Sequence, residues 1–156
     1  MDLQSYQDTL LGTASTRHGD LPLVVSVLGL VGSAGAVHSY LGVRDNQNFV
    51  VNLARVLFGT ISLLNALDLK IKPFIGGIYK QPSPLMNPKA IATILLLRCA
   101  SLANILEDSV DKETTLDMIS IKRHIQHILV CIYQLGLEYD YTPNQLADLS
   151  LSTLDQ

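Results

Sequence analysis

The chain has 156 residues, a length typical of one domain, and 48% of them are apolar. Charged residues make up only 16% of the chain, against about 25% in an average soluble domain. This balance excludes an intrinsically disordered chain, which would combine high net charge with few aliphatic side chains. The net charge is −3 and the 11 basic residues are scattered, so we expect no nucleic-acid partner.

Apolar residues recur with a helical period along most of the chain, and β-hairpin signals are absent. The pattern predicts a single all-α domain over residues 1–156. We expect about six helices in a bundle, at Leu3–Ser15, Leu21–Leu41, Asn48–Ile71, Lys89–Asp108, Ser120–Leu137 and Pro143–Leu154. Thr142 and Pro143 are suited to the N-cap and first position of the last helix. Prolines and glycines predict one non-helical connector over residues 72–88.

Two of the expected helices carry an apolar stripe beside a narrower stripe of small or polar residues. The apolar stripes are Val50, Leu53, Leu57, Ile61 and Leu64, and Ile121, Ile125, Ile128, Leu129 and Ile132. The narrower stripes are Asn52, Arg55, Gly59 and Ser62, and Ser120, Arg123, His127 and Gln134. Each apolar stripe predicts the face that a helix buries in the core.

The two halves of the chain align without gaps at a constant offset of 68 residues across both long helices of each half. Identical pairs are Leu28 with Leu96, Ser33 with Ser101, Arg55 with Arg123, Leu67 with Leu135, and Leu69 with Leu137. The shared offset and the matching polar stripes predict an internal duplication. Repeat 1 then covers residues 1–71 and repeat 2 covers residues 89–156, with the connector between them.

The low charge raises the question of a membrane span. Leu21–Val37 is free of charge but has 17 residues, short of the roughly 20 that a span needs, and it contains a proline and three glycines. Arg55 and Arg98 interrupt the other long apolar segments, and a central arginine costs about 2.5–3.5 kcal/mol on insertion. The chain opens Met1-Asp2-Leu3-Gln4, without the features of a signal peptide. We therefore expect a cytoplasmic protein with no membrane partner.

Cys99 and Cys131 lie in apolar helical patterns, so we expect buried, reduced thiols. Gly29, Gly32 and Gly35 fall inside a helical pattern, and close approach of another helix would account for them.

Other candidate sites have weaker patterns. His124 and His127 share a helix face, but zinc needs three or four ligands and no third is near in sequence. The acidic residues Glu107, Asp108, Asp111, Glu113 and Asp117 are typical of a solvated, helix-capping turn. The tyrosines at 40, 79, 133, 139 and 141 could stack a base, although such side chains more often seal helix interfaces. We expect neither a metal nor another cofactor.

Several short motifs resemble the MazG-like, all-α nucleoside triphosphate pyrophosphohydrolases. Residues 28–37, LGLVGSAGAV, are close to the family's L-G-L-A-G-E-A-G-E-V run. Residues 52–58, NLARVLF, stand where the family has E-L-G-D-V-L-W, and residues 63–69, LLNALDL, resemble its L-A-D-A-L-G-L ending. In the second half, residues 134–138, QLGLE, repeat that ending, and residues 145–148, QLAD, resemble the family's closing helix.

This resemblance implies four metal-binding positions in each repeat, at which the family carries carboxylates that hold Mg²⁺ and activate water. They read Ser33, Ala36, Asn52 and Arg55 in the first repeat, and Ser101, Asn104, Ser120 and Arg123 in the second. None of the eight is acidic, and arginine repels a cation. The resemblance therefore implies a pseudoenzyme that has lost metal-dependent hydrolysis.

Arginine in place of a carboxylate also converts a cation site into an anion site, because guanidinium matches phosphate geometry. We expect a nucleotide or nucleotide-derived ligand to be bound without hydrolysis by Arg55, Arg123, Ser33, Asn52, Ser101, Asn104 and Ser120. Such a protein would act as a sensor or a sequestering decoy. Two alternatives stay open: a structural or protein-interaction module with a vestigial pocket, and a residual pyrophosphohydrolase. Family sites form between packed helices of paired subunits, so the resemblance also implies a homo-oligomer.

Overall fold

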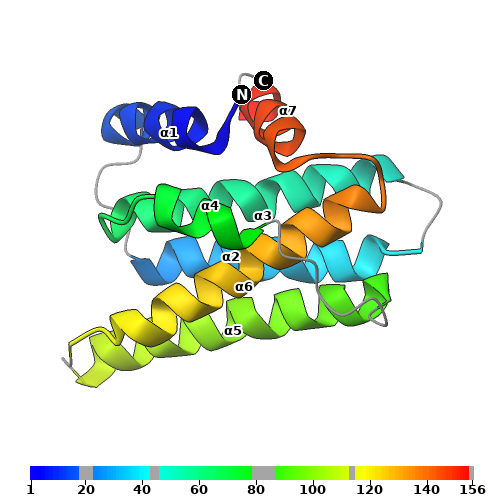
Figure 1. Cartoon of the computed structure of the whole chain (residues 1–156). Coiled ribbons are helices and arrows are strands. Elements are labelled where there is room, and N and C mark those ends of the chain that lie inside the picture. Colours follow the sequence, from blue (N-terminus) through cyan, green and yellow to red (C-terminus); the bar gives the residue numbers. More distant parts are fainter. Residues whose placement is uncertain (18–22, 43–45, 79–86, 113–114, 155–156) are drawn as a thin grey trace.

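A computed structural model describes residues 1–17, 23–42, 46–78, 87–112 and 115–154. Over these ranges the chain forms seven α-helices and no strand, which confirms the predicted all-α class (Figure 1). The helices are α1 (Leu3–Arg17), α2 (Leu23–Tyr40), α3 (Asn46–Ala66), α4 (Lys72–Ile78), α5 (Pro88–Lys112), α6 (Met118–Leu137) and α7 (Pro143–Leu154).

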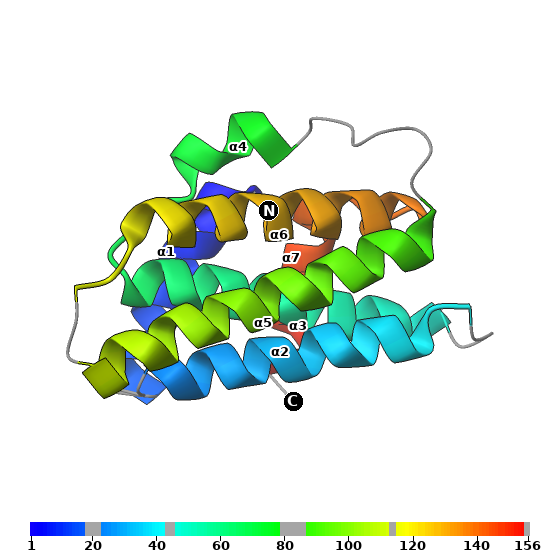
Figure 2. The ribbon, with the colours of Figure 1, turned by 90° about the horizontal axis from the view of Figure 1, so that it is seen from below.

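The four long helices α2, α3, α5 and α6 form the bundle. Helix α2 packs against α3 and α5, and α6 packs against the same two helices, so the contacts close into a ring. Helices α1 and α7 cover α3, while the short α4 lies on α6 (Figures 1 and 2). The predicted apolar stripes of α3 and α6 are buried as expected. Burial of these stripes supplies the main driving force for the bundle.

Local hydrogen bonds set the first residues of α6 and α7. The Asp117 carboxylate accepts a hydrogen bond from the backbone N–H of Ser120, which caps α6. At α7, the Thr142 hydroxyl accepts from the Gln145 N–H at 3.2 Å, and the Gln145 side chain accepts from the Thr142 N–H at 2.8 Å. These reciprocal bonds form a capping box and confirm Thr142 and Pro143 as the start of the helix.

The third helix ends at Ala66, five residues before the predicted end at Ile71. Asp68 adopts a φ of 55°, and the Leu69 N–H reaches back to the Leu64 carbonyl at 2.8 Å. Helix α6 ends in the same way, with Asp140 at a φ of 61° and the Tyr141 N–H bonded to the Gly136 carbonyl. An aspartate in left-handed conformation thus terminates both helices, a role more often taken by glycine.

The prediction of a wholly non-helical connector over residues 72–88 was wrong. Residues Lys72–Ile78 form α4, because Pro73 lies in the first turn, where a helix does not need the missing N–H. The buried side chains of Phe74 and Ile78 fix this short helix. The prolines at 82 and 84 lie outside the described residues.

The expected role of the α2 glycines was also wrong. A Cβ atom added to Gly29, Gly32 or Gly35 would meet no atom within 4 Å, so no helix approaches them closely. Close approach occurs instead at Gly59 on α3, where an added Cβ would lie 3.2 Å from Cδ1 of Leu30. The low helix propensity of these three glycines is therefore not offset by close packing of another helix.

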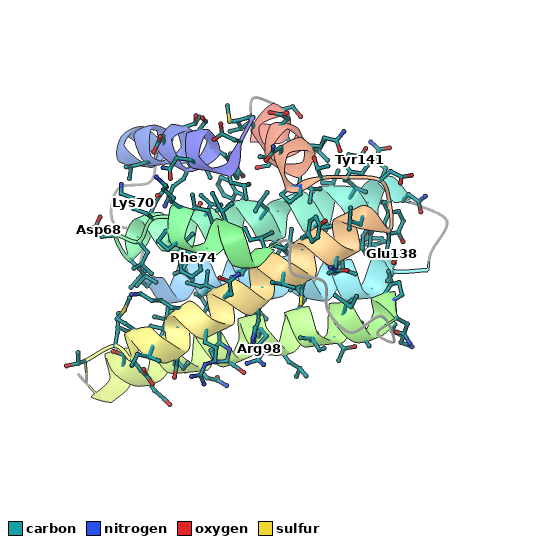
Figure 3. All side chains as sticks on the ribbon, in the orientation of Figure 1. Asp68, Lys70, Phe74, Arg98, Glu138 and Tyr141 are labelled. Atoms are coloured by element: carbon teal, nitrogen blue, oxygen red, sulfur yellow. The ribbon has the colours of Figure 1, made fainter. Side chains whose placement is uncertain are left out.

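The packing of the two halves is reciprocal. Helix α4 follows α3 in the chain but packs on α6, whereas α7 follows α6 but packs on α3. The two similar helix ends lie at opposite ends of the bundle, as the positions of Asp68 and Tyr141 show (Figure 3). This exchange is the pattern expected of two repeats related by a pseudo-two-fold axis. The duplication and the repeat boundaries stay predictions.

Two helical segments, Asn46–Ala66 and Pro88–Ser109, are long and apolar enough to cross a membrane. They are the two apolar segments that Arg55 and Arg98 interrupt, and neither coincides with Leu21–Val37. The core helix of a soluble protein passes the same test; 61% of the window in Asn46–Ala66 is buried within the fold, and 33% of the window in Pro88–Ser109. These helices are therefore weak support for a span, and the cytoplasmic location stays a prediction.

Candidate functional site

The predicted ligand residues of the first repeat lie on α2 and α3, which pack against each other. Ser33 is half-buried on α2, Asn52 is buried on α3, and Arg55 is exposed one turn further along α3. The Asn52 side-chain amide donates a hydrogen bond to the Asn48 carbonyl at 2.8 Å. One amide hydrogen of Asn52 is therefore already used within its own helix. Arg55 is the charged group of this set.

The predicted residues of the second repeat lie on α5 and α6, which also pack together. Ser101 is half-buried and Asn104 exposed on α5, while Ser120 is half-buried and Arg123 exposed on α6. The Ser120 hydroxyl donates to the Asp117 carboxylate at 2.8 Å, so it takes part in capping the helix. Arg123 again supplies the positive charge of the set.

Two cavities lie away from all seven predicted residues, at one end of the bundle. One, of about 620 Å³, lies where α3 begins and α6 runs into α7, and its wall includes Glu138 and Asp140. The other, of about 490 Å³, shares Glu138 and Tyr139 with it. Tyr139 stacks on Phe49 with ring centroids 4.3 Å apart. The larger cavity has room for a small ligand, but its two carboxylates disfavour a phosphate there.

A concentration of positive charge occurs instead between α5 and α6. We call Arg98, Arg123, His124 and His127 the α5–α6 basic cluster. Nη1 of Arg98 lies 3.3 Å from Nδ1 of His124 across the two helices, and Arg98 lies near the middle of α5 (Figure 3). Nδ1 of His127, one turn along α6 from His124, is buried without a hydrogen-bond partner. A second buried nitrogen without a partner, Nε2 of Gln134, lies on the same helix face.

Burial and mutual repulsion act on both imidazoles. Partial burial lowers the pKa of His124 below its ordinary value, and the positive charges of Arg98, His127 and Arg123 lower it further. Burial likewise lowers the pKa of His127, and Arg98 and Arg123 add to the effect. Both directions are those expected where burial and neighbouring positive charges disfavour a protonated imidazole.

No ion pair neutralises the cluster within the part of the chain that the structure describes. The ion pair formed there joins the α-amino group of Met1 to the Asp148 carboxylate, at 3.1 Å. Asp117 is close enough to Arg123 for the guanidinium to contribute to lowering the pKa of the carboxyl, although its hydrogen bonds with Ser120 contribute more. The cluster can thus accept an anion without first displacing a bound carboxylate.

Over the described ranges, no three histidine, cysteine, aspartate or glutamate side chains gather into a group that could hold a metal ion. The structure does not describe the side chain of Asp111, and Glu113 and Tyr79 lie outside the described ranges. The other four tyrosines are half-buried against the core, and both cysteines are buried free thiols, as expected.

The sequence revealed three of the four cluster residues but not how they combine. His124 and His127 were recognisable as a pair on one face, with Arg123 beside them. Arg98 lies 26 residues from His124, and its sequence signal was a charge in the middle of an otherwise apolar helix. Since a buried or half-buried arginine needs a polar neighbour, that signal could have pointed to an inter-helix polar site.

No protein-family model, curated protein or solved structure matches this chain. The resemblance to the MazG-like family therefore stays a prediction from short motifs.

Proposed function

We propose that this protein binds a nucleotide or a nucleotide-derived molecule through its phosphates and does not hydrolyse it. The observation that supports the proposal is the α5–α6 basic cluster, in which Arg98 contacts His124, the neighbour in sequence of the predicted residue Arg123. The cluster has no ion-pair partner among the described residues. Arginine forms strong, bidentate hydrogen bonds with phosphate, and histidine adds a donor when protonated. In this role the protein acts in the cytoplasm as a sensor or a sequestering decoy.

The absence of hydrolysis follows from the residues at the eight positions where the resemblance places carboxylates. Serine, alanine, asparagine and arginine occupy all of them. Without carboxylate ligands, a divalent cation has no anionic anchor there to activate water. Assays of phosphate and pyrophosphate release with Mg²⁺ or Mn²⁺ should give rates equal to those of buffer. Robust turnover that survives repurification would overturn this part of the proposal.

Ligand binding is tested by a thermal-shift screen with nucleoside triphosphates, dinucleotides and cyclic nucleotides. A ligand at 100 times its dissociation constant should stabilise the fold by about 2.7 kcal/mol. Calorimetric titration of each hit is then repeated with the double variant Arg98→Gln/Arg123→Gln. Loss of binding is expected, because both arginines of the α5–α6 basic cluster are removed. Unchanged binding by the variant, or no hit in the screen, would contradict the proposal.

A second candidate function is a structural or protein-interaction module. Large apolar side chains favour it, since Leu28 on α2, Leu97 on α5 and Ile119 on α6 are 59%, 60% and 75% exposed. A contiguous apolar patch is typical of interaction surfaces, and these three side chains are the candidates for one. Homo-oligomer formation is tested by light scattering of the wild type and of the variant Leu28→Ser/Leu97→Ser. A monomer at all concentrations would count against a homo-oligomer.

A further inference from the structure

The constant offset of 68 residues assigns a counterpart in the first half to each residue of the α5–α6 basic cluster. Arg98 corresponds to Leu30, His124 to Val56, and His127 to Gly59. Arg123 alone keeps its chemistry, because it corresponds to Arg55. The offset therefore pairs one position between α2 and α3 with one position between α5 and α6.

In the first half this position is apolar and closed. Leu30 and Val56 are 1% and 0% exposed. A Cβ atom added to Gly59 would lie 3.2 Å from Cδ1 of Leu30, so the leucine side chain already fills the space beside the glycine. An anion there would lose its hydration and meet no donor side chain from these three residues.

In the second half the same position is polar and carries charge. Arg98 replaces the leucine and meets His124, while His127 stands where the first half has glycine. The buried Nδ1 of His127 has no hydrogen-bond partner among the described residues. Leaving such a group unsatisfied destabilises the folded state, and a bound ion is one of the physical reasons for which proteins retain such groups.

We propose that only the second half binds the ligand, by holding one phosphate group per chain between Arg98, His124 and His127, with Arg123 at the rim. This inference rests on the proposed function but narrows it, because the first half then contributes no phosphate site and Leu30 is the reason. The binding group is a di- or trianionic oxyanion such as a terminal phosphate. Phosphate binding also draws protons onto the imidazoles, since a neighbouring anion stabilises their charged form.

The test is a calorimetric titration of the full chain with inorganic pyrophosphate, without added metal, to measure both affinity and stoichiometry. One site per chain is expected. The variant Arg98→Leu places in α5 the residue that α2 has, and we expect it to weaken binding by at least about tenfold. The matched control Lys122→Gln removes an exposed positive charge from α6, and its affinity should stay within about twofold of wild type.

Histidine resonances give a second readout that does not depend on the variant. In ¹H–¹³C spectra of the wild type, pyrophosphate should raise the pKa of His124 and of His127. Thermal melting separately checks that the Arg98→Leu variant is folded. Two sites per chain, binding by Arg98→Leu equal to wild type, or unperturbed histidines would each overturn the inference. Two equal sites together with intact nucleotide binding would overturn this inference but not the proposed function. Binding of pyrophosphate but of no nucleotide would instead reject the proposed function and retain the site.

Discussion

Individual polar side chains connect parts of this fold that lie far apart in the sequence. The Gln7 side chain on α1 is 2% exposed; its amide donates to the Leu69 carbonyl at 2.7 Å, and its Oε1 accepts from the Ile71 N–H at 2.8 Å. Tyr6 beside it shares a buried hydrogen bond with Ser150 on α7. Burial raises the pKa of Tyr6 to about 12, so the phenol stays neutral. These residues hold α1 against the end of α3 and against α7.

The variant Gln7→Leu should therefore be strongly destabilised. Leucine fills similar space but leaves the Leu69 carbonyl and the Ile71 N–H buried without partners, at about 1–3 kcal/mol each. Urea unfolding followed by circular dichroism measures the loss. The matched control is Gln4→Leu, since Gln4 makes only an exposed bond to Asp8 in the same helix. Equal stability of the two variants would show that the Gln7 bonds are not needed.

The lowered pKa values of His124 and His127 predict how stability depends on pH. In the unfolded chain both residues titrate near the ordinary value of 6.5, and in the folded chain they titrate below it. Between these values the unfolded state binds more protons, so stability is complete above pH 6.5 and falls as the pH drops through the folded-state pKa. Asp2 and Asp117, whose pKa values are lowered from 3.8, change the stability only at lower pH.

Urea unfolding at pH 7.5 and 5.5 measures this loss of stability. The double variant His124→Gln/His127→Gln should lose less stability over the same interval than the wild type does. Pyrophosphate should also reduce the loss in the wild type. A pH dependence that is identical in the variant would assign the effect to other groups.

At the scale of helices, a few contacts decide where one element ends and another can pack. The turn between α6 and α7 folds back so that the Tyr141 carbonyl oxygen would lie 2.6 Å from a Cβ atom at position 136. Because the Tyr141 N–H is bonded to the Gly136 carbonyl at 2.9 Å, the backbone there has little freedom to move away. Only glycine fits at this position, although it lies within a helix where it has low propensity.

We expect Gly136→Ala to destabilise the protein by about 1–3 kcal/mol, since the backbone must shift to admit a methyl group. The control is Gly32→Ala on α2, where an added Cβ meets nothing within 4 Å. That substitution should stabilise the fold by up to about 1 kcal/mol, because alanine has the higher helix propensity. Thermal melting of both variants measures the difference. Stabilisation by Gly136→Ala would contradict the close contact.

For the whole molecule, the buried thiols report on cooperative opening of the core. Burial raises the pKa of Cys99 to about 12 and that of Cys131 to about 11, so neither forms a reactive thiolate at neutral pH. Cys99 lies on α5 and Cys131 on α6, which form one side of the bundle. Both thiols should therefore become reactive only when these helices separate.

Labelling with iodoacetamide should be slow in the native protein and should accelerate with urea in parallel with global unfolding. An added cysteine at the exposed position Thr115→Cys supplies the control, because it should react rapidly without denaturant. Mass spectrometry assigns the label to each thiol. Rapid native labelling of Cys99 would show that the bundle opens locally at α5 and α6.

Much of the fold could be predicted from the sequence because helices are specified by nearby residues. The apolar stripes of α3 and α6 follow the 3.6-residue period, and Asp117, Thr142 and Gln145 mark helix starts through bonds to residues three positions away. The early end of α3 and the existence of α4 were missed. Both depend on Asp68 entering the left-handed region and on Phe74 and Ile78 being buried, which local pattern alone does not determine.

Local sequence pattern specifies the helical class, the boundaries of most helices and the buried stripes, and the sequence has no carboxylate at the eight positions in question. The contact of Arg98 with His124 and the packing of Leu30 beside Gly59 depend on tertiary structure, because they join different helices. They depend on how each helix is rotated about its axis and how deeply it docks, and this follows from packing of the whole core. Helical period places a side chain on a face, and the neighbouring helix then determines its chemical surroundings.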